Sequence, residues 1–366
     1  FLPSDTEFAE RKARGIGLTR PELAILLSYS KIVLKQQLLD SDVPEDSYLA
    51  KELVRYFPVP LQETYREHME RHRLRREIIV TSVTNSMVNR MGATFVLRMQ
   101  EDTGETPGQI AKAYAIAREV LKVRDLWAAI EALDGKVHEN AQVDALLRIW
   151  NLMRHSTRWL LNLPGDRLDI AGAVARYAKG VESLRGCLAT CLAESDRLAA
   201  EAEKERWTRA GFGEKLALQL AELAAFASAF DIIEVALERK LPVPRVAEVF
   251  YALGEALHLK WMMARIEELP VEGRWHALAR GTHRDELFAQ HRALVAQVLA
   301  WAATHEAQDA DGRTIVQHWL NRDDSGLRYT LGMLADMRNQ VVMDYPTISV
   351  AVRRLAHLVQ SGTRAG

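Results

Sequence analysis

Residues 17–104 decide the fold: they begin GLTRPELAILLSYSKI at Gly17 and end HRLRREIIVTSVTNSMVNRMGATFVLRMQEDTG from His72. Thr19 and Glu22 have the spacing of a capping box, in which each side chain bonds the backbone N–H of the other residue. Pro21 falls in the first turn, where its missing N–H costs nothing. The segment therefore predicts a helix that begins after Thr19 and ends near Leu39.

Helix signals of the same kind continue on both sides of this segment. Ser4 with Glu7 predicts an earlier helix that Gly15 stops. Thr106, Pro107 and Gln109 predict a later helix, and helices are also expected over 125–133 and 142–161. The apolar spacing of the helix after Thr106 predicts a buried face made of Ile110, Tyr114, Ala117 and Leu121.

The second half of the chain is expected to be more helical still. From Ile170 to Trp207 there is no proline, and good helix formers dominate. Gly281, Gly312 and Gly326 are predicted at turns, and Thr347 as the cap of a last helix. No stretch alternates apolar and polar residues between turns, so no strand is predicted, and about 70% helix is expected.

These signals predict an all-α protein, an irregular multi-helix bundle. A shift in composition near Pro164-Gly165 suggests two packed helical subdomains, residues 1–163 and 164–366.

Composition excludes several classes of function. The chain has 366 residues, with 48 Lys or Arg and 49 Asp or Glu, and a formal net charge of −1, so no global field attracts nucleic acid or an acidic membrane. No apolar run approaches the roughly 20 residues of a membrane span. Two cysteines, Cys187 and Cys191, give no disulfide framework, and a cytoplasmic location is expected. The chain opens with Phe1, and we interpret it as part of a longer protein.

Motifs that could hold a nucleotide are incomplete. Gly15-Ile-Gly17 has Arg20 where a dinucleotide loop needs its third glycine, and Gly211-Phe-Gly213 has Leu216. Neither pair follows a predicted strand, so the phosphate-binding turn has no support. Both pairs are better interpreted as turn glycines, and no cofactor-binding residue is predicted.

Motifs for metals or catalysis are equally weak. His68 and His72 lie four residues apart on an expected helix, but Met69 replaces the glutamate of the zincin pattern and arginines crowd the segment. Cys187 and Cys191 have no cluster of ligands beside them and are interpreted as core residues. Asp323-Asp324 is expected to cap or precede a helix. The sequence therefore predicts neither a catalytic residue nor a metal ligand.

One expected helix, from Leu74 to Met99, differs from the others. Its apolar residues step by four, and small uncharged polar residues stand between them. This pattern predicts a helix covered on most sides, with Asn85 and Asn89 buried and hydrogen-bonded inside. A surface for a ligand or a partner domain is the alternative. Glu63, Glu67, Glu70 and Glu77 stand at helical spacings around the arginines from Arg71 to Arg76 and indicate a charge-paired face.

The motifs together resemble the C-terminal region of the large bacterial NAD-specific glutamate dehydrogenases. The resemblance is carried by GLTRPELAILLSYSKI, SDVPEDSYL, YFPVPLQ, HRLRREII, VNRMGATF and LWAAIEALDGKV, between about Gly15 and Asn162. It implies a parent enzyme that oxidatively deaminates L-glutamate to 2-oxoglutarate and ammonium with NAD. The nucleotide fold and the catalytic residues of that family lie upstream, so the resemblance implies that NAD binds outside this chain.

Two functional hypotheses follow. In the first, the chain is a non-catalytic C-terminal domain that packs on its own catalytic domain or on neighbouring subunits of a homo-oligomer, in assembly or regulation. Arg75, Arg76, Asn85 and Asn89 are the predicted interface residues, and an exposed apolar patch is expected. In the second, the chain is an autonomous all-α interaction module or a helical enzyme, which would show a cleft with convergent titratable groups.

Overall fold

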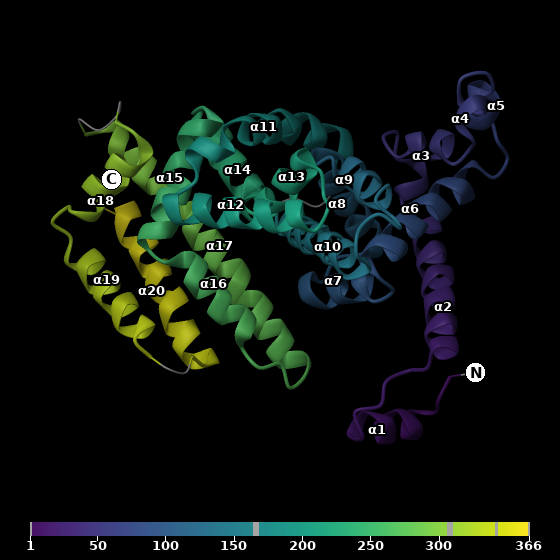
Figure 1. Ribbon diagram of the computed structural model, residues 1–366, viewed down its shortest axis with the longest axis horizontal. Helices are drawn as coiled ribbons and strands as arrows, with labels where there is room; N and C mark the ends of the chain where they lie inside the picture. The colour runs from purple at the N-terminus through teal and green to yellow at the C-terminus, as the bar shows by residue number, and fades with distance from the viewer. Residues whose placement is uncertain (1, 164–167, 306–309, 341–342, 365–366) are drawn as a thin grey trace. The chain divides into compact units, whose positions relative to one another are not determined.

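The protein is all-α, as its sequence predicts. The computed structural model describes residues 2–163, 168–305, 310–340 and 343–364 (Figure 1). These ranges contain twenty α-helices and one short 3₁₀ helix, and none of their residues lies in a β-strand. Within them, no helix is both long and apolar enough to cross a membrane.

The chain divides into two compact units, of which unit 1 comprises residues 1–119 and 153–174. Unit 1 contains the first eight α-helices and the 3₁₀ helix, and several of these helices are short. In chain order the helices are α1 (Asp5–Ala13), α2 (Arg20–Leu39), the 3₁₀ helix η1 (Val43–Glu45), α3 (Ala50–Arg55), α4 (Val59–Gln62), α5 (Arg66–Glu70), α6 (Arg75–Met91), α7 (Phe95–Thr103) and α8 (Pro107–Val120).

Unit 2 comprises residues 120–152 and 175–366, so helices α10 and α11 are divided between the units. Its helices are α9 (Val123–Glu131), α10 (Glu139–Leu161), α11 (Ile170–Cys191), α12 (Glu194–Arg209), α13 (Glu214–Phe226), α14 (Ala229–Arg239), α15 (Val243–Ala256), α16 (Leu259–Glu268), α17 (Arg274–Ala303), α18 (Gly312–Leu320), α19 (Ser325–Arg338) and α20 (Tyr345–Arg364). The boundary expected between residues 163 and 164 borders residues outside the described ranges and stays a prediction.

The helix starts expected at Ser4, Thr19 and Thr106 are confirmed. Ser4 with Glu7 and Thr19 with Glu22 both form complete capping boxes, and α2 ends at Leu39. Gln109 donates its backbone N–H to Thr106 Oγ1 at 3.3 Å at the start of α8. The face of this helix expected to be buried is fully enclosed.

The expected helix from Leu74 to Met99 is two helices. Gly92 follows α6 with φ of 91°, a left-handed value that favours glycine, and α7 begins at Phe95. The four-residue apolar step continues across the break, since Met91, Phe95 and Met99 are all buried. Periodicity alone therefore could not reveal the change of direction.

Three smaller expectations are wrong. Gly281 is a buried residue inside α17, not a turn. The last helix begins before Thr347, whose N–H bonds the Asp344 carboxylate at 2.8 Å. α5 ends before His72, so His68 and His72 do not share a helix face.

Candidate docking surface

Helix α2 has an anchored end and an uncovered end. Its C-terminal half packs on α6 and η1, and Leu34 and Leu38 are buried there. Its N-terminal half stands clear of the other helices of unit 1 in Figure 1 and is joined to α1 through Arg11, which donates to both carboxylate oxygens of Glu22 at 2.9 and 3.0 Å. α2 therefore projects a length of helix that unit 1 leaves uncovered.

From Leu23 to Val33, which reaches past the middle of the helix, α2 exposes apolar side chains on nearly every side. Tyr29, Ile32 and Val33 are 61%, 62% and 53% exposed. With Leu23, Leu26 and Leu27, which are also exposed, these residues form what we call the α2 apolar surface. At about 100° per residue their positions spread around most of the helix, and a helix that is hydrophobic all round is normally buried.

The polar residues within this segment add little polarity. Ser28 Oγ donates to the carbonyl of Ala24 at 2.8 Å, and Ser30 Oγ donates to the carbonyl of Leu26 at 2.7 Å. Both hydroxyl groups therefore have a hydrogen-bond partner inside the helix. No charged side chain occurs from Leu23 to Ser30. The segment can consequently be covered by another apolar surface without leaving these hydroxyl protons unpaired.

Arg75 and Arg76 lie in the first turn of α6, next to the anchored end of α2. Both form ion pairs with Glu45, at 3.6 Å and 2.9 Å respectively. Arg76 also donates from Nη2 to the carbonyl of Leu39 at 3.1 Å, which satisfies one of the free carbonyls at the C-terminus of α2. Both side chains are about half exposed. Arg76 thus helps to fix α2, whereas Glu45 is the only partner of the Arg75 side chain within the described ranges.

The expected burial of Asn85 and Asn89 is wrong. Asn89 is exposed and Asn85 is partly exposed, and among the described residues neither side chain has a hydrogen-bond partner. The buried face of α6 is a single stripe, so residues 85 and 89 fall on its opposite side. The stripe consists of Ile79, Val80, Val83, Thr84, Met87, Val88 and Met91. Because they lie on the opposite side from this stripe, Asn85 and Asn89 are accessible to a partner.

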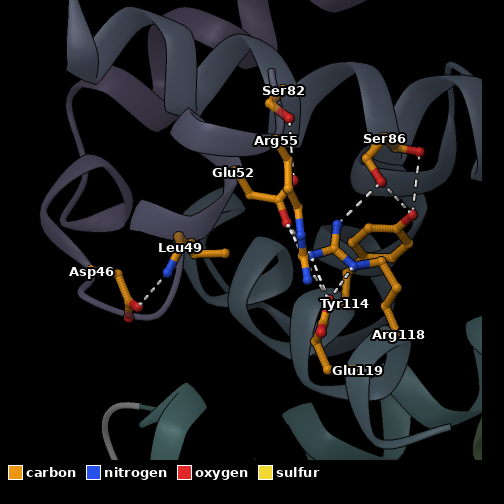
Figure 2. Close-up of polar contacts among 9 residues, drawn as sticks. All are labelled: Asp46, Leu49, Glu52, Arg55, Ser82, Ser86, Tyr114, Arg118 and Glu119. Atoms are coloured by element: carbon orange, nitrogen blue, oxygen red, sulfur yellow. Dashed lines mark hydrogen bonds and ion pairs between the residues drawn. The ribbon is translucent and has the colours of Figure 1, made fainter. Parts of the chain in front are cut away.

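Ser82 and Ser86 of α6 take part in a hydrogen-bond network with α3 and α8. Ser82 Oγ donates to Glu52 Oε2 at 3.2 Å, and Ser86 Oγ lies 3.0 Å from the hydroxyl of Tyr114 (Figure 2). Arg118 donates to Ser86 Oγ at 3.3 Å and to Glu52 Oε1 at 2.7 Å. This buried network ties α3, α6 and α8 together.

The outer edge of the network also holds α3 in place. Arg118 Nε donates to Glu119 at 3.2 Å, and Arg55 bridges Glu52 and Glu119 (Figure 2). Asp46 accepts from the backbone N–H of Leu49 at 3.2 Å, just before α3 begins. The network keeps α6 rigid, and α6 carries the anchored end of α2.

The other residues singled out in the sequence have structural positions. Asp324 caps α19 by accepting from the backbone N–H of Leu327 at 3.0 Å, as expected. Cys191 is buried, and burial raises the pKa of its thiol to about 12, whereas Cys187 is only partly buried. In the described part of the chain, no group of three or more His, Cys, Asp or Glu side chains could hold a metal ion.

The sequence predicts an exposed apolar patch but not its position on α2. The available signal was the uncharged run from Leu23 to Ser30, which continues in apolar residues beyond Lys31. A solvated helix of this length carries charged residues on its outer side.

Comparisons with known proteins find relatives that are much longer than this chain. Over 365 residues the chain is 38% identical to the NAD-specific glutamate dehydrogenase of Pseudomonas aeruginosa and 35% identical to that of Halomonas elongata. It is 30% identical over 363 residues to that of Mycobacterium tuberculosis. These matches cover 99% or more of this chain and 22% of each relative, so the chain spans about a fifth of their length.

A family model agrees with these relatives. The model described as "Glutamate dehydrogenase, C-terminal" matches residues 15–357, which include most of both units. The matched range contains all of α2 and the whole buried network of unit 1. The chain belongs to the glutamate dehydrogenase C-terminal family.

Proposed function

We propose that this chain is the non-catalytic C-terminal part of an NAD-specific glutamate dehydrogenase and that it serves the assembly of that enzyme. In this proposal the oxidative deamination of L-glutamate to 2-oxoglutarate and ammonium, with NAD as the oxidant, takes place on residues outside this chain. Support comes from relatives that carry that name and are more than four times as long as their matched region. A cytoplasmic location and a homo-oligomeric enzyme are part of the same proposal.

The observation that carries the assembly role is the α2 apolar surface. Large apolar side chains that stay half exposed lose favourable burial, which is worth about 1.5–3 kcal/mol for each side chain of this size when complete. Covering the α2 apolar surface would therefore contribute several kcal/mol, of the order that a docking interface within one protein requires. We propose that the catalytic part of the enzyme, or a neighbouring subunit, covers it.

Two of the predicted interface residues offer polar groups elsewhere on unit 1. Arg75 has a half-exposed guanidinium with a single partner, and Asn89 has an exposed amide without one in the described ranges. Interfaces commonly combine an apolar centre with a polar rim that keeps hydrogen-bonding capacity. Arg75 and Asn89 are therefore better candidates for intermolecular contacts than Arg76, which is bound to α2 itself.

The experiment compares one double variant in two settings. Tyr29→Ser with Ile32→Ser removes the two most exposed side chains of the α2 apolar surface. In the full-length enzyme we expect turnover of glutamate to fall at least about tenfold or the oligomer to dissociate, because about 1.4 kcal/mol of lost docking is a tenfold change. In the 366-residue chain we expect an unchanged melting temperature, because neither side chain is buried there.

A matched control separates docking from a general effect of lost apolar surface. Leu198→Ser removes a similarly exposed side chain from α12 in unit 2, and it should leave both measurements unchanged. Wild-type turnover and wild-type oligomer size in the Tyr29→Ser, Ile32→Ser enzyme would disprove the docking role of α2. Glutamate turnover by the 366-residue chain without the rest of the enzyme would disprove the non-catalytic assignment.

A further inference from the structure

Unit 2 contains a cavity that has no part in the proposed docking through α2. Its volume is about 550 Å³, and its walls come from α12, α13, α15, α16 and α17, with Arg148 of α10 at one edge. These helices pack on one another in unit 2, and α12 with α13 and α15 with α17 are among the contacting pairs (Figure 1). A volume of this size is typical of sites for small molecules.

The walls of the cavity are mainly apolar. Alanines of α12 and α13 leave the space open, and larger side chains of α15, α16 and α17 close it. Representative wall residues are Ala199, Ala221, Ala225, Tyr251, Trp261 and Phe288. Such walls favour a ligand with an apolar body.

One carboxylate in the wall has no partner. Glu222, on α13, is only 8% exposed, and among the described residues no hydrogen bond or ion pair reaches its carboxylate. Burial raises its pKa above the ordinary value, against the pull of Arg185. The guanidinium of Arg185 is held elsewhere, over the ring of Phe226 at 4.8 Å from the centroid. A partly desolvated carboxylate of this kind is stabilised by a cation that joins it.

The other acidic groups of the cavity wall are already bound. Asp196 accepts from Lys260 at 2.5 Å, and Glu203 pairs with Arg148 at 2.7 Å. Glu255 accepts from the hydroxyl of Ser195 at 2.6 Å, and Glu267 pairs with Arg284 at 2.9 Å. These contacts use the lysine and arginine of the cavity wall, so neither is available to Glu222.

The histidines of the wall do not supply a positive charge to Glu222 either. His291 is buried, burial lowers its pKa to about 4, and its Nε2 lies 3.0 Å from the carbonyl of Phe250. His258 Nε2 lies 2.8 Å from Nη1 of Arg338, and burial with this arginine lowers its pKa. At neutral pH both imidazoles are therefore uncharged.

We propose that this cavity binds an organic cation, an ammonium or guanidinium group carried on an apolar body, whose charged end pairs with Glu222. The pair would be a charge-assisted hydrogen bond in apolar surroundings, which is roughly twice as strong as a neutral one. The apolar body would occupy the space between the alanines and the aromatic side chains. An anion of the same size would meet an unpaired carboxylate and be excluded.

The test titrates the 366-residue chain with phenethylammonium, and with phenethyl alcohol and phenylacetate as neutral and anionic compounds of similar shape. Calorimetry gives the affinity, and the indole N–H signal of Trp261 shows whether the compound enters the cavity. We expect the cation to bind at least about tenfold more tightly than either of the others. Equal binding of the three compounds, or no binding of the cation, overturns the proposal.

Two variants test whether the carboxylate of Glu222 binds the cation. Glu222→Gln keeps the shape of the side chain. It should weaken the binding of the cation at least about tenfold and leave the affinity for the alcohol unchanged. Glu205→Gln removes an exposed carboxylate of α12 outside the cavity and should change nothing. A melting temperature of Glu222→Gln at or above that of the wild type shows that the variant is folded. Unchanged affinity for the cation in this variant overturns the assignment of Glu222.

The full-length enzyme supplies the last comparison. If the cavity is a ligand site, the cation binds the full-length enzyme and the 366-residue chain alike. Loss of binding in the full-length enzyme would show that the rest of the polypeptide fills the cavity, and the proposal would then be wrong. Because unit 2 does not contain α2, this result does not depend on the outcome of the Tyr29→Ser, Ile32→Ser experiment.

Discussion

The guanidinium of Arg118 lies 2.7 Å from the carboxylate of Glu52, and both side chains are almost completely removed from solvent. The two residues are 66 positions apart, and their pair joins α8 to α3. In the low dielectric of a protein interior, the attraction between such charges roughly offsets the loss of hydration. The pair therefore contributes less to net stability than its geometry suggests, but losing one member is costly.

We expect Arg118→Met to lower the free energy of unfolding by about 3–5 kcal/mol, because it leaves the Glu52 carboxylate buried without its main cation. The double variant Glu52→Leu with Arg118→Met should recover much of this loss. Urea unfolding of the 366-residue chain measures both. A loss well below about 1 kcal/mol in the single variant would show that Arg55 is a sufficient partner for Glu52.

Two polar residues of α6 should respond differently to substitution. Ser86→Ala removes a partner of both Tyr114 and Arg118, and we expect a loss of about 1–3 kcal/mol. Asn89→Leu changes an exposed residue without a partner in the described ranges, and we expect a change within about 0.5 kcal/mol. Thermal melting of the two variants gives the comparison. A large loss for Asn89→Leu would restore the buried position expected from the sequence.

Charge reversal at Arg75 and at Arg76 should have different effects on α2. Arg76→Glu removes the hydrogen bond to the Leu39 carbonyl, and because the side chain is half exposed we expect a loss of no more than about 1 kcal/mol. Faster amide hydrogen exchange should appear in the last turn of α2. Arg75→Glu should leave that exchange unchanged, so it is the better charge reversal for testing an interface in the full-length enzyme. Similar exchange in both variants would contradict the assignment of the Leu39 contact to Arg76.

His291 should make the chain less stable in mild acid. Its pKa is lowered to about 4 in the folded protein from an ordinary value of 6.5, because it is buried. As pH falls below 6.5 the unfolded chain takes up a proton that the folded chain refuses until about pH 4. The free energy of unfolding therefore decreases over this range, by up to about 1.4 kcal/mol per pH unit.

His291→Gln should flatten this dependence, since glutamine does not titrate there and its amide can still donate to the carbonyl of Phe250. Melting curves between about pH 7 and 5 give the slope, within the range where His291 would titrate. His318→Gln changes an exposed histidine of α18 and should keep the wild-type slope. The same slope in His291→Gln and the wild type would contradict the burial of this imidazole.

Features that depend on neighbouring residues could be predicted from the sequence. The capping boxes at Ser4 and Thr19 need only side chains three residues apart, and the buried face of α8 needs only helical spacing. The break at Gly92 could not be found, because the apolar step of four continues from Met91 to Phe95. Gly281 shows the opposite error, since a helix tolerates a glycine at a cost of about 1 kcal/mol when packing favours the helix.

The residues of the candidate sites were harder to predict, because their roles depend on distant partners. Arg76 belongs to a charged run in the sequence, and only the fold shows that it reaches the carbonyl of Leu39. Glu222 lies in the helical stretch EKLALQLAELAAF and looks like an ordinary surface residue there. That no described side chain bonds its carboxylate depends on how other helices pack around it, which no local pattern reveals.

The α2 apolar surface has a practical consequence for handling the protein. With a net charge of −1, two copies of the 366-residue chain repel each other very little at neutral pH. Exposed leucine, isoleucine and tyrosine side chains on such a weakly charged molecule favour precipitation and concentration-dependent clustering. Oligomers found with the separated chain would then reflect its colloidal behaviour, and its solubility should improve when the remainder of the enzyme is present.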